Sequence, residues 1–144
     1  MNICKKVIES NPVKRPIIKN AIKAFIIGGI VGLISEGLIE LFTNIFNIET
    51  KIANSLMSMT LVAVTSLLTG VGIFDKLGQF SGAGTFIPIT GFANSMTSSA
   101  LEGKSEGVVL GIMSNMFKLA GAVIVAGVVS AFISGTIIFL LRGI

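Results

Sequence analysis

Long stretches without charge alternate with short charged ones along this 144-residue chain. Residues 24–35, 52–74, 78–100 and 119–141 contain no Asp, Glu, Lys or Arg. A helix over 52–74 would reach ~35 Å, which is enough to cross a hydrocarbon core of ~30 Å with some tilt. The pattern predicts an all-α integral membrane protein with transmembrane helices at about 21–42, 52–74 and 119–141.

Small residues recur at helical spacing on each predicted span. Every fourth residue of the first gives Ala24, Gly28, Gly32, Glu36 and Glu40, and the last gives Lys118, Ala122, Ala126, Ser130 and Ser134. Small side chains let helices approach closely, so we expect helix packing at Gly28, Gly32, Ala122, Ala126 and Ser130. On the second span the same spacing selects Asn54, Ser58, Val62, Ser66 and Gly70. Glu36 and Glu40 are expected either at the outer interface or deeper, beside a partner or a water-filled path.

The uncharged stretch 78–100 is composed like a loop, with glycine and hydroxyl residues throughout. Irregular backbone cannot face lipid, since each unsatisfied amide or carbonyl there costs several kcal/mol. We therefore expect a broken or re-entrant helical element at about 77–101, with a fourth span as the alternative, and a short helix capped by Thr90. A helix N-terminus inside a membrane suits an anionic group, whereas a tightly packed kinked helix would bind nothing.

The last apolar region, 107–141, is too long for one span. As a continuous helix it would measure ~52 Å. The length predicts a break or a strong tilt, with a half-helix at about 107–117. Lys118 would then either lie near a solute or extend to the interface, as lysines at such positions often do.

Composition supports a membrane protein, because 52% of the residues are apolar and 12% are charged, against roughly a quarter charged in soluble domains. Residues 1–20 form a basic arm and 21–144 a single membrane domain. Six basic residues precede the first uncharged run and predict a cytoplasmic N-terminus: Lys5, Lys6, Lys14, Arg15, Lys19 and Lys23. The chain has no His and one Cys, Cys4, so we expect neither an enzyme nor a cofactor.

Polar and flexible residues around the broken element are the candidates for a solute path. They are Lys76, Gln79, Gly82, Gly84, Thr85, Pro88, Thr90, Asn94, Ser95, Asn115 and Lys118. No firm metal site is expected, and the acidic residues considered for one, Asp75, Glu102 and Glu106, flank the broken element.

Several motifs resemble the SpoVAC/SpoVAEb membrane-protein family of spore-forming bacteria. They are FDKLGQFSGAG at 74–84, PITGFANSM at 88–96, KSEG at 104–107 and NMFKLAG at 115–121, and KAFIIGGIVGLISEGL at 23–38 also fits. The resemblance covers the chain from about Pro16 onward. It implies a subunit of a complex in the inner membrane of the developing spore.

The resemblance also implies what that complex does. It would move dipicolinic acid, with calcium, into the spore core during sporulation and release it at germination. This chain would be a channel subunit beside a SpoVAEb-like membrane subunit and a SpoVAD-like soluble subunit, with its N-terminus on the core side and no nucleic acid involved. A structural scaffold subunit and a tension-gated pore of low selectivity are the alternatives.

Overall fold

The structure, a computed structural model, describes residues 16–142, so most of the basic arm, including Lys5, Lys6, Lys14 and Arg15, lies outside the described residues. Within that range every regular element is a helix, which confirms the predicted all-α fold class. The elements are α2 (Ile17–Glu40), η1 (Leu41–Ile45), α3 (Thr50–Gly70), α4 (Ile73–Ser81), α5 (Ala83–Phe86), α6 (Ile89–Glu102), η2 (Gly103–Glu106), η3 (Val108–Met113) and α7 (Ser114–Arg142).

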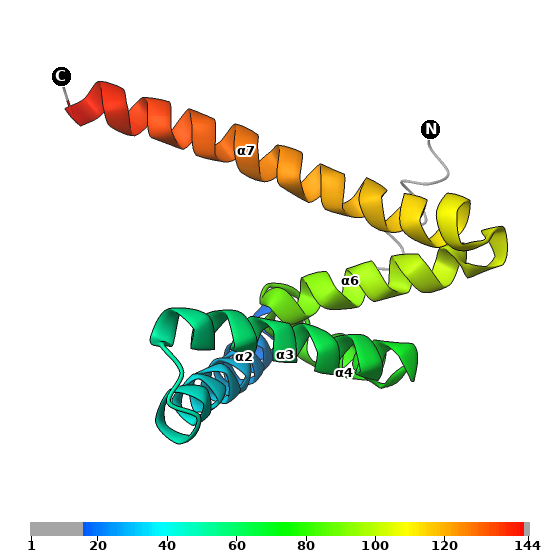
Figure 1. Ribbon diagram of the computed structural model, residues 1–144, viewed down its shortest axis with the longest axis horizontal. Coiled ribbons are helices and arrows are strands. Elements are labelled where there is room, and N and C mark those ends of the chain that lie inside the picture. The colour runs from blue at the N-terminus through cyan, green and yellow to red at the C-terminus, as the bar shows by residue number, and fades with distance from the viewer. Residues whose placement is uncertain (1–15, 143–144) are drawn as a thin grey trace.

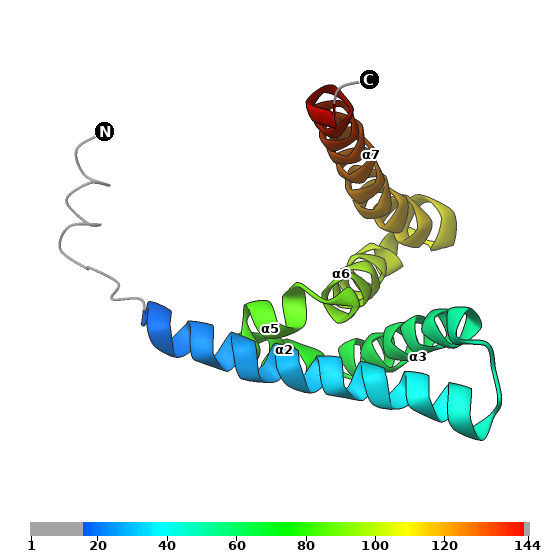
Figure 2. The same ribbon diagram turned by 90° about the vertical axis from the view of Figure 1, so that its left-hand side faces the viewer.

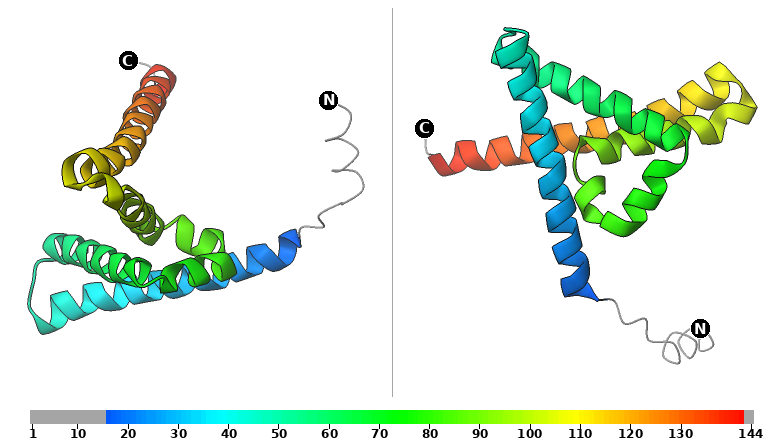
Figure 3. Two further views of the ribbon diagram at one scale, coloured as in Figure 1. Left: turned by 90° about the vertical axis from the view of Figure 1, so that its right-hand side faces the viewer. Right: turned by 90° about the horizontal axis from the view of Figure 1, so that it is seen from below.

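Three helical stretches in the described part of the chain are long and apolar enough to cross a membrane. They are Ile17–Ile45, which joins α2 to η1, Thr50–Gly70, which is α3, and Val108–Arg142, which joins η3 to α7. α2 and α3 are in contact and diverge in a V from the turn that joins them (Figures 2 and 3). Asn47, in the turn between them, has a positive φ of 50°.

Three short helices follow α3 and form the broken element. Gly82 separates α4 from α5 with φ 54° and ψ −124°, a conformation that residues with a Cβ rarely adopt. α4 runs back from the end of α3, and α6 then turns again toward that same end (Figures 1 and 3). The 14 residues of α6 extend only ~21 Å, which is less than the ~30 Å of a hydrocarbon core. The charged residues at the start of α4 and at the end of α6 therefore lie toward the same end of α3, and re-entry into a membrane stays a prediction.

The last apolar region is continuous and does not contain the break expected near 107–117. η3 is π-helical and passes directly into α7 at Ser114. This region has no proline, and a π-helical turn can be accommodated within a helix without interrupting it. α7 runs back across α6 and then extends away from the rest of the molecule (Figure 1), so none of its residues is buried.

The core lies where α2, α3 and the broken element meet. Its buried apolar side chains are Ala53, Leu61, Phe74 and Ala93, and its buried polar side chains are Thr65, Thr69, Ser81, Thr85, Thr90 and Asn94. The packed face of α3 therefore follows Leu61, Thr65 and Thr69, whereas the predicted stripe contains exposed residues at Asn54 and Gly70. Both rows have helical spacing, so the spacing alone does not identify the buried one.

Gly84 brings α5 into backbone contact with α2. A Cβ on Gly84 would lie 2.5 Å from the carbonyl oxygen of Ala24 and 3.0 Å from the backbone nitrogen of Gly28. A Cβ on Gly28 would in turn lie 3.7 Å from the Cα of Gly84. The two helices therefore approach as closely as glycine allows, and this contact fixes the broken element against the first membrane-length helix.

Gly84→Ala is expected to destabilise the protein by about 1–3 kcal/mol, because the backbone atoms that the new methyl group meets cannot rotate away. The measurement is reversible unfolding of the purified protein in mixed micelles. Gly32→Ala is the matched control, since nothing lies within 4 Å of a Cβ there. It should be neutral or stabilise the helix by up to ~1 kcal/mol. Equal stability of Gly84→Ala and the wild type would contradict the packing described here.

Candidate functional site

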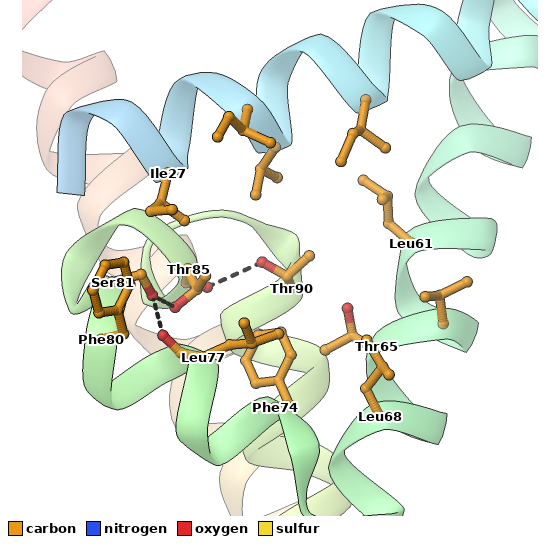
Figure 4. Close-up of a pocket in the computed structure, with 14 residues that line it drawn as sticks. Ile27, Leu61, Thr65, Leu68, Phe74, Leu77, Phe80, Ser81, Thr85 and Thr90 are labelled. Atoms are coloured by element: carbon orange, nitrogen blue, oxygen red, sulfur yellow. Dashed lines mark hydrogen bonds between the residues drawn. The ribbon is translucent and has the colours of Figure 1, made fainter. Parts of the chain in front are cut away.

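An apolar cavity of about 310 Å³ lies between α2, α3 and α4 (Figure 4). Ile27 and Leu61 lie toward opposite ends of it, and Phe74 and Leu77 form the wall contributed by α4. The hydroxyl-bearing residues Ser81, Thr85 and Thr90 gather near Ile27, while Thr65 faces in from α3. Thr85 and Thr90 are among the predicted path residues, whereas nothing in the sequence pattern singled out Ser81 or Thr65.

The hydroxyls of Ser81, Thr85 and Thr90 at this cavity are hydrogen-bonded within the protein, whereas the Thr65 hydroxyl makes no such bond among the described residues. Ser81 Oγ donates to the carbonyl oxygen of Leu77 at 2.7 Å and lies 2.6 Å from Thr85 Oγ1. Thr90 Oγ1 donates to the carbonyl oxygen of Thr85 at 3.0 Å. An anion needs donors that are free to turn toward it, so this cavity is poorly suited to a dicarboxylate.

The start of α6 differs from the predicted one, in which Thr90 caps the helix. α6 begins at Ile89, and its N-cap is Pro88, with no side chain bonded to the first turn. Thr90 is therefore inside the helix and is not its cap. Proline takes this place readily, because its φ, here −64°, is compatible with a helix start and its missing N–H would have had no partner.

Asn94 is buried and paired with α3. Thr69 Oγ1 lies 2.8 Å from Asn94 Oδ1 and 2.8 Å from the carbonyl oxygen of Thr65. The single proton of the Thr69 hydroxyl is thus shared between two acceptors, one on its own helix and one on α6. Since Asn94 is only 7% exposed, this contact joins two helices and leaves its carbonyl oxygen turned toward protein.

A polar pocket lies at the corner where α6 ends and α7 begins. Its volume is about 310 Å³, and Ser99, Glu102, Asn115, Lys118 and Leu119 line it. Glu102 and Lys118 are exposed, while Ser99 and Asn115 are half-buried. We call these residues the corner pocket. It brings together three residues that the sequence had assigned separately, a candidate cation contact at Glu102 and two path candidates at Asn115 and Lys118.

Two glycines hold the corner pocket in shape. A Cβ on Gly103 would lie 2.6 Å from the carbonyl oxygen of Gly111 and 2.7 Å from Asn115 Nδ2. A Cβ on Gly111 would overlap the carbonyl oxygen of Gly103. η2 and η3 therefore touch backbone to backbone, and Asn115 is held beside Gly103, one residue after Glu102.

The other path candidates lie apart from the corner pocket. Lys76 and Gln79 are exposed on α4, and Gln79 lines a second cavity with Asn20 and Gly82. Pro88 is half-buried, and Ser95 donates to the carbonyl oxygen of Gly91 at 3.0 Å. The carboxylates Asp75 and Glu106 are exposed, and no cluster of three or more potential metal ligands occurs among residues 16–142.

Of the residues predicted to pack between helices, only some are in contact with another helix in the described part of the chain. Gly28 faces Gly84, whereas nothing lies within 4 Å of a Cβ on Gly32. Ala122, Ala126 and Ser130 are exposed on α7, so their predicted packing would require another chain. Glu36 and Glu40 are also exposed, with no burial that would demand a partner within this chain.

Comparison with known proteins gives one family and one curated relative. The family model described as SpoVAC/SpoVAEB sporulation membrane protein matches residues 20–137. Stage V sporulation protein AC of Bacillus subtilis (strain 168) is 52% identical over 126 residues, which cover 88% of this chain and 84% of that protein. No solved structure matches the chain.

A double-mutant cycle tests the bond between α3 and α6. Thr69→Val and Asn94→Leu should each lower the free energy of unfolding, with a coupling of about 0.6 kcal/mol and at most ~1.7 kcal/mol, as for interhelical hydrogen bonds in membrane proteins. Thr60→Val is the matched control, since its hydroxyl donates only within α3, to the carbonyl oxygen of Leu56 at 2.8 Å. Its effect should add to that of Asn94→Leu, and equal coupling in both pairs would contradict the assignment.

Proposed function

This chain belongs to the SpoVAC/SpoVAEb family of sporulation membrane proteins, and we propose that it is a channel or permease subunit for dipicolinic acid. In this proposal the solute crosses the spore inner membrane together with calcium, inward during sporulation and outward at germination. A SpoVAEb-like membrane subunit and a SpoVAD-like soluble subunit are the proposed partners. The N-terminus is proposed to face the spore core, because basic residues favour the cytoplasmic side of a membrane.

The observation that carries the proposal is the mixed charge of the corner pocket. Glu102 and Asn115 offer the carboxylate and carbonyl oxygens that Ca²⁺ prefers, and Lys118 offers an ammonium group for a carboxylate. Dipicolinate carries two carboxylates and chelates calcium, so the complex presents both signs of charge. A pocket that contains both a carboxylate and an ammonium group suits the calcium–dipicolinate complex better than it suits calcium or dipicolinate alone.

The broken element contributes to the proposal through its shape. Its buried hydroxyls are bonded inside the protein, and the cavity beside them is lined mainly by apolar residues. We therefore place the entry of the path at the corner pocket and its continuation along α7. Because α7 has no buried residue, the remaining walls of the path would come from neighbouring subunits.

A scaffold role is the second candidate, and α7 is the observation that favours it. Large apolar side chains are exposed along its whole length, for example Ile124 at 64% and Phe132 at 74%. In a scaffold these side chains would bind partner subunits, and the corner pocket would have no solute to contact.

Flux of dipicolinate distinguishes the two roles. Proteoliposomes are loaded with calcium dipicolinate and contain this chain alone or with its SpoVAEb-like partner. Lys118→Gln should slow release about tenfold or more, because a hydrogen bond to a charged group contributes ~1.5–3 kcal/mol. Glu102→Gln should abolish the effect of calcium on the rate.

Lys51→Gln is the matched control, since Lys51 is exposed at the start of α3 and does not line the corner pocket. It should leave the flux unchanged. If Lys118→Gln and Glu102→Gln both transport like the wild type, the corner pocket is not on the path. Complexes that assemble normally but pass no dipicolinate in any preparation would leave the scaffold role as the account of this chain.

A further inference from the structure

Two neighbouring cavities together have the shape of an amphiphile. The apolar cavity of about 310 Å³ between α2, α3 and α4 adjoins a second cavity of about 490 Å³, and Phe80 and Ser81 line both. The second cavity also has amide side chains, from Asn20 on α2 and Gln79 on α4. An apolar compartment thus opens beside one that is also lined mainly by apolar residues but contains two amide side chains.

A positive charge lies beside Phe80, the aromatic residue that lines both cavities, although Lys23 itself lines neither of them. The Nζ of Lys23 is 4.5 Å from the centroid of the Phe80 ring. A cation–π contact holds the ammonium group in place but leaves its net charge uncompensated. An anion in the second cavity would therefore meet the amides of Asn20 and Gln79, with the Lys23 ammonium group held nearby against the Phe80 ring.

The apolar cavity is suited to a hydrocarbon chain. It has about twice the volume of the ~150 Å³ cavity that, in other proteins, stays dry and takes up benzene. Along α2 it is lined from Ile27 to Ile34, so that Lys23 lies 11 residues, or ~16 Å, from the far end. Its rim residues Ile30, Val64 and Leu77 are about half exposed, and in a membrane protein such apolar side chains contact lipid.

We infer that these two cavities form a binding site for one phospholipid with an anionic headgroup. The phosphate lies by Lys23, Asn20 and Gln79, and an acyl chain enters between α2, α3 and α4. The lipid then fills a space that the three helices leave open and bridges the first two membrane-length helices to the broken element. Basic side chains at helix ends commonly bind anionic headgroups in this way. This inference does not depend on the proposed transport of dipicolinate.

Native mass spectrometry of the detergent-purified protein tests the site. Phosphatidylglycerol and phosphatidylcholine with the same acyl chains are titrated separately. One phosphatidylglycerol should be retained in preference, and Lys23→Gln should weaken its binding about fivefold without changing phosphatidylcholine. Lys51→Gln is the matched charge control and should bind phosphatidylglycerol like the wild type.

Two further arms test the acyl-chain cavity. Val64→Phe narrows its rim and should weaken the binding of both lipids, while Val128→Phe, on the exposed face of α7, should not. Glycerol 3-phosphate alone should not bind, which separates a lipid site from a simple anion site. If Val64→Phe does not give monodisperse protein, Val31→Phe narrows the same cavity from α2.

Three outcomes would overturn the inference. One is an equal decrease in phosphatidylglycerol binding in Lys23→Gln and Lys51→Gln, which would indicate that the lipid is attracted by the overall positive charge of the surface and not by a specific site. Another is undiminished lipid binding in the cavity-narrowing variant. The third is binding of glycerol 3-phosphate at the affinity of the intact lipid.

Discussion

The backbone contact between Gly84 and α2 is the constraint on which the rest of the arrangement depends. A Cβ on Gly84 would come within 2.5 Å of the Ala24 carbonyl oxygen, so no other residue fits without moving a helix. The contact holds α5 against the first membrane-length helix, and thereby sets where α4 ends and α6 begins. Ser81, Thr85 and the wall of the apolar cavity take their positions from it.

Burial of this irregular backbone divides the polar residues into two groups. Inside the broken element, hydroxyls donate to nearby carbonyl oxygens, as Ser81 does to Leu77 and Thr90 to Thr85. This satisfies them in a place where lipid and apolar side chains offer no partner. At the corner between α6 and α7, Glu102 and Lys118 remain exposed. Charged groups that can bind a solute are therefore available at the corner pocket. The broken element positions the helices around its cavity but offers no charged group among the described residues that line it.

The sequence alone predicted what depends on local composition. Uncharged runs gave three membrane-length helices, and the glycine- and hydroxyl-rich stretch gave a broken element. It did not select the packed face of α3, since the row through Thr65 and Thr69 has the same period as the row through Asn54 and Gly70. The prediction of Thr90 as a cap was wrong because the helix starts one residue earlier, at Ile89, directly after Pro88. It could not bring Glu102 to Lys118, because that proximity depends on the tertiary turn at Gly103 and Gly111.

We conclude that the buried cluster at Thr85 and Thr90 is closed to water and that the corner pocket is open to it. Single cysteines at residues 85, 90, 99 and 115, in a Cys4→Ser background, test this directly in reconstituted membranes with a membrane-impermeant thiol reagent. The account predicts labelling at 99 and 115 and protection at 85 and 90. Labelling at 85 and 90 with protection at the corner would contradict it and would place the solute path through the broken element.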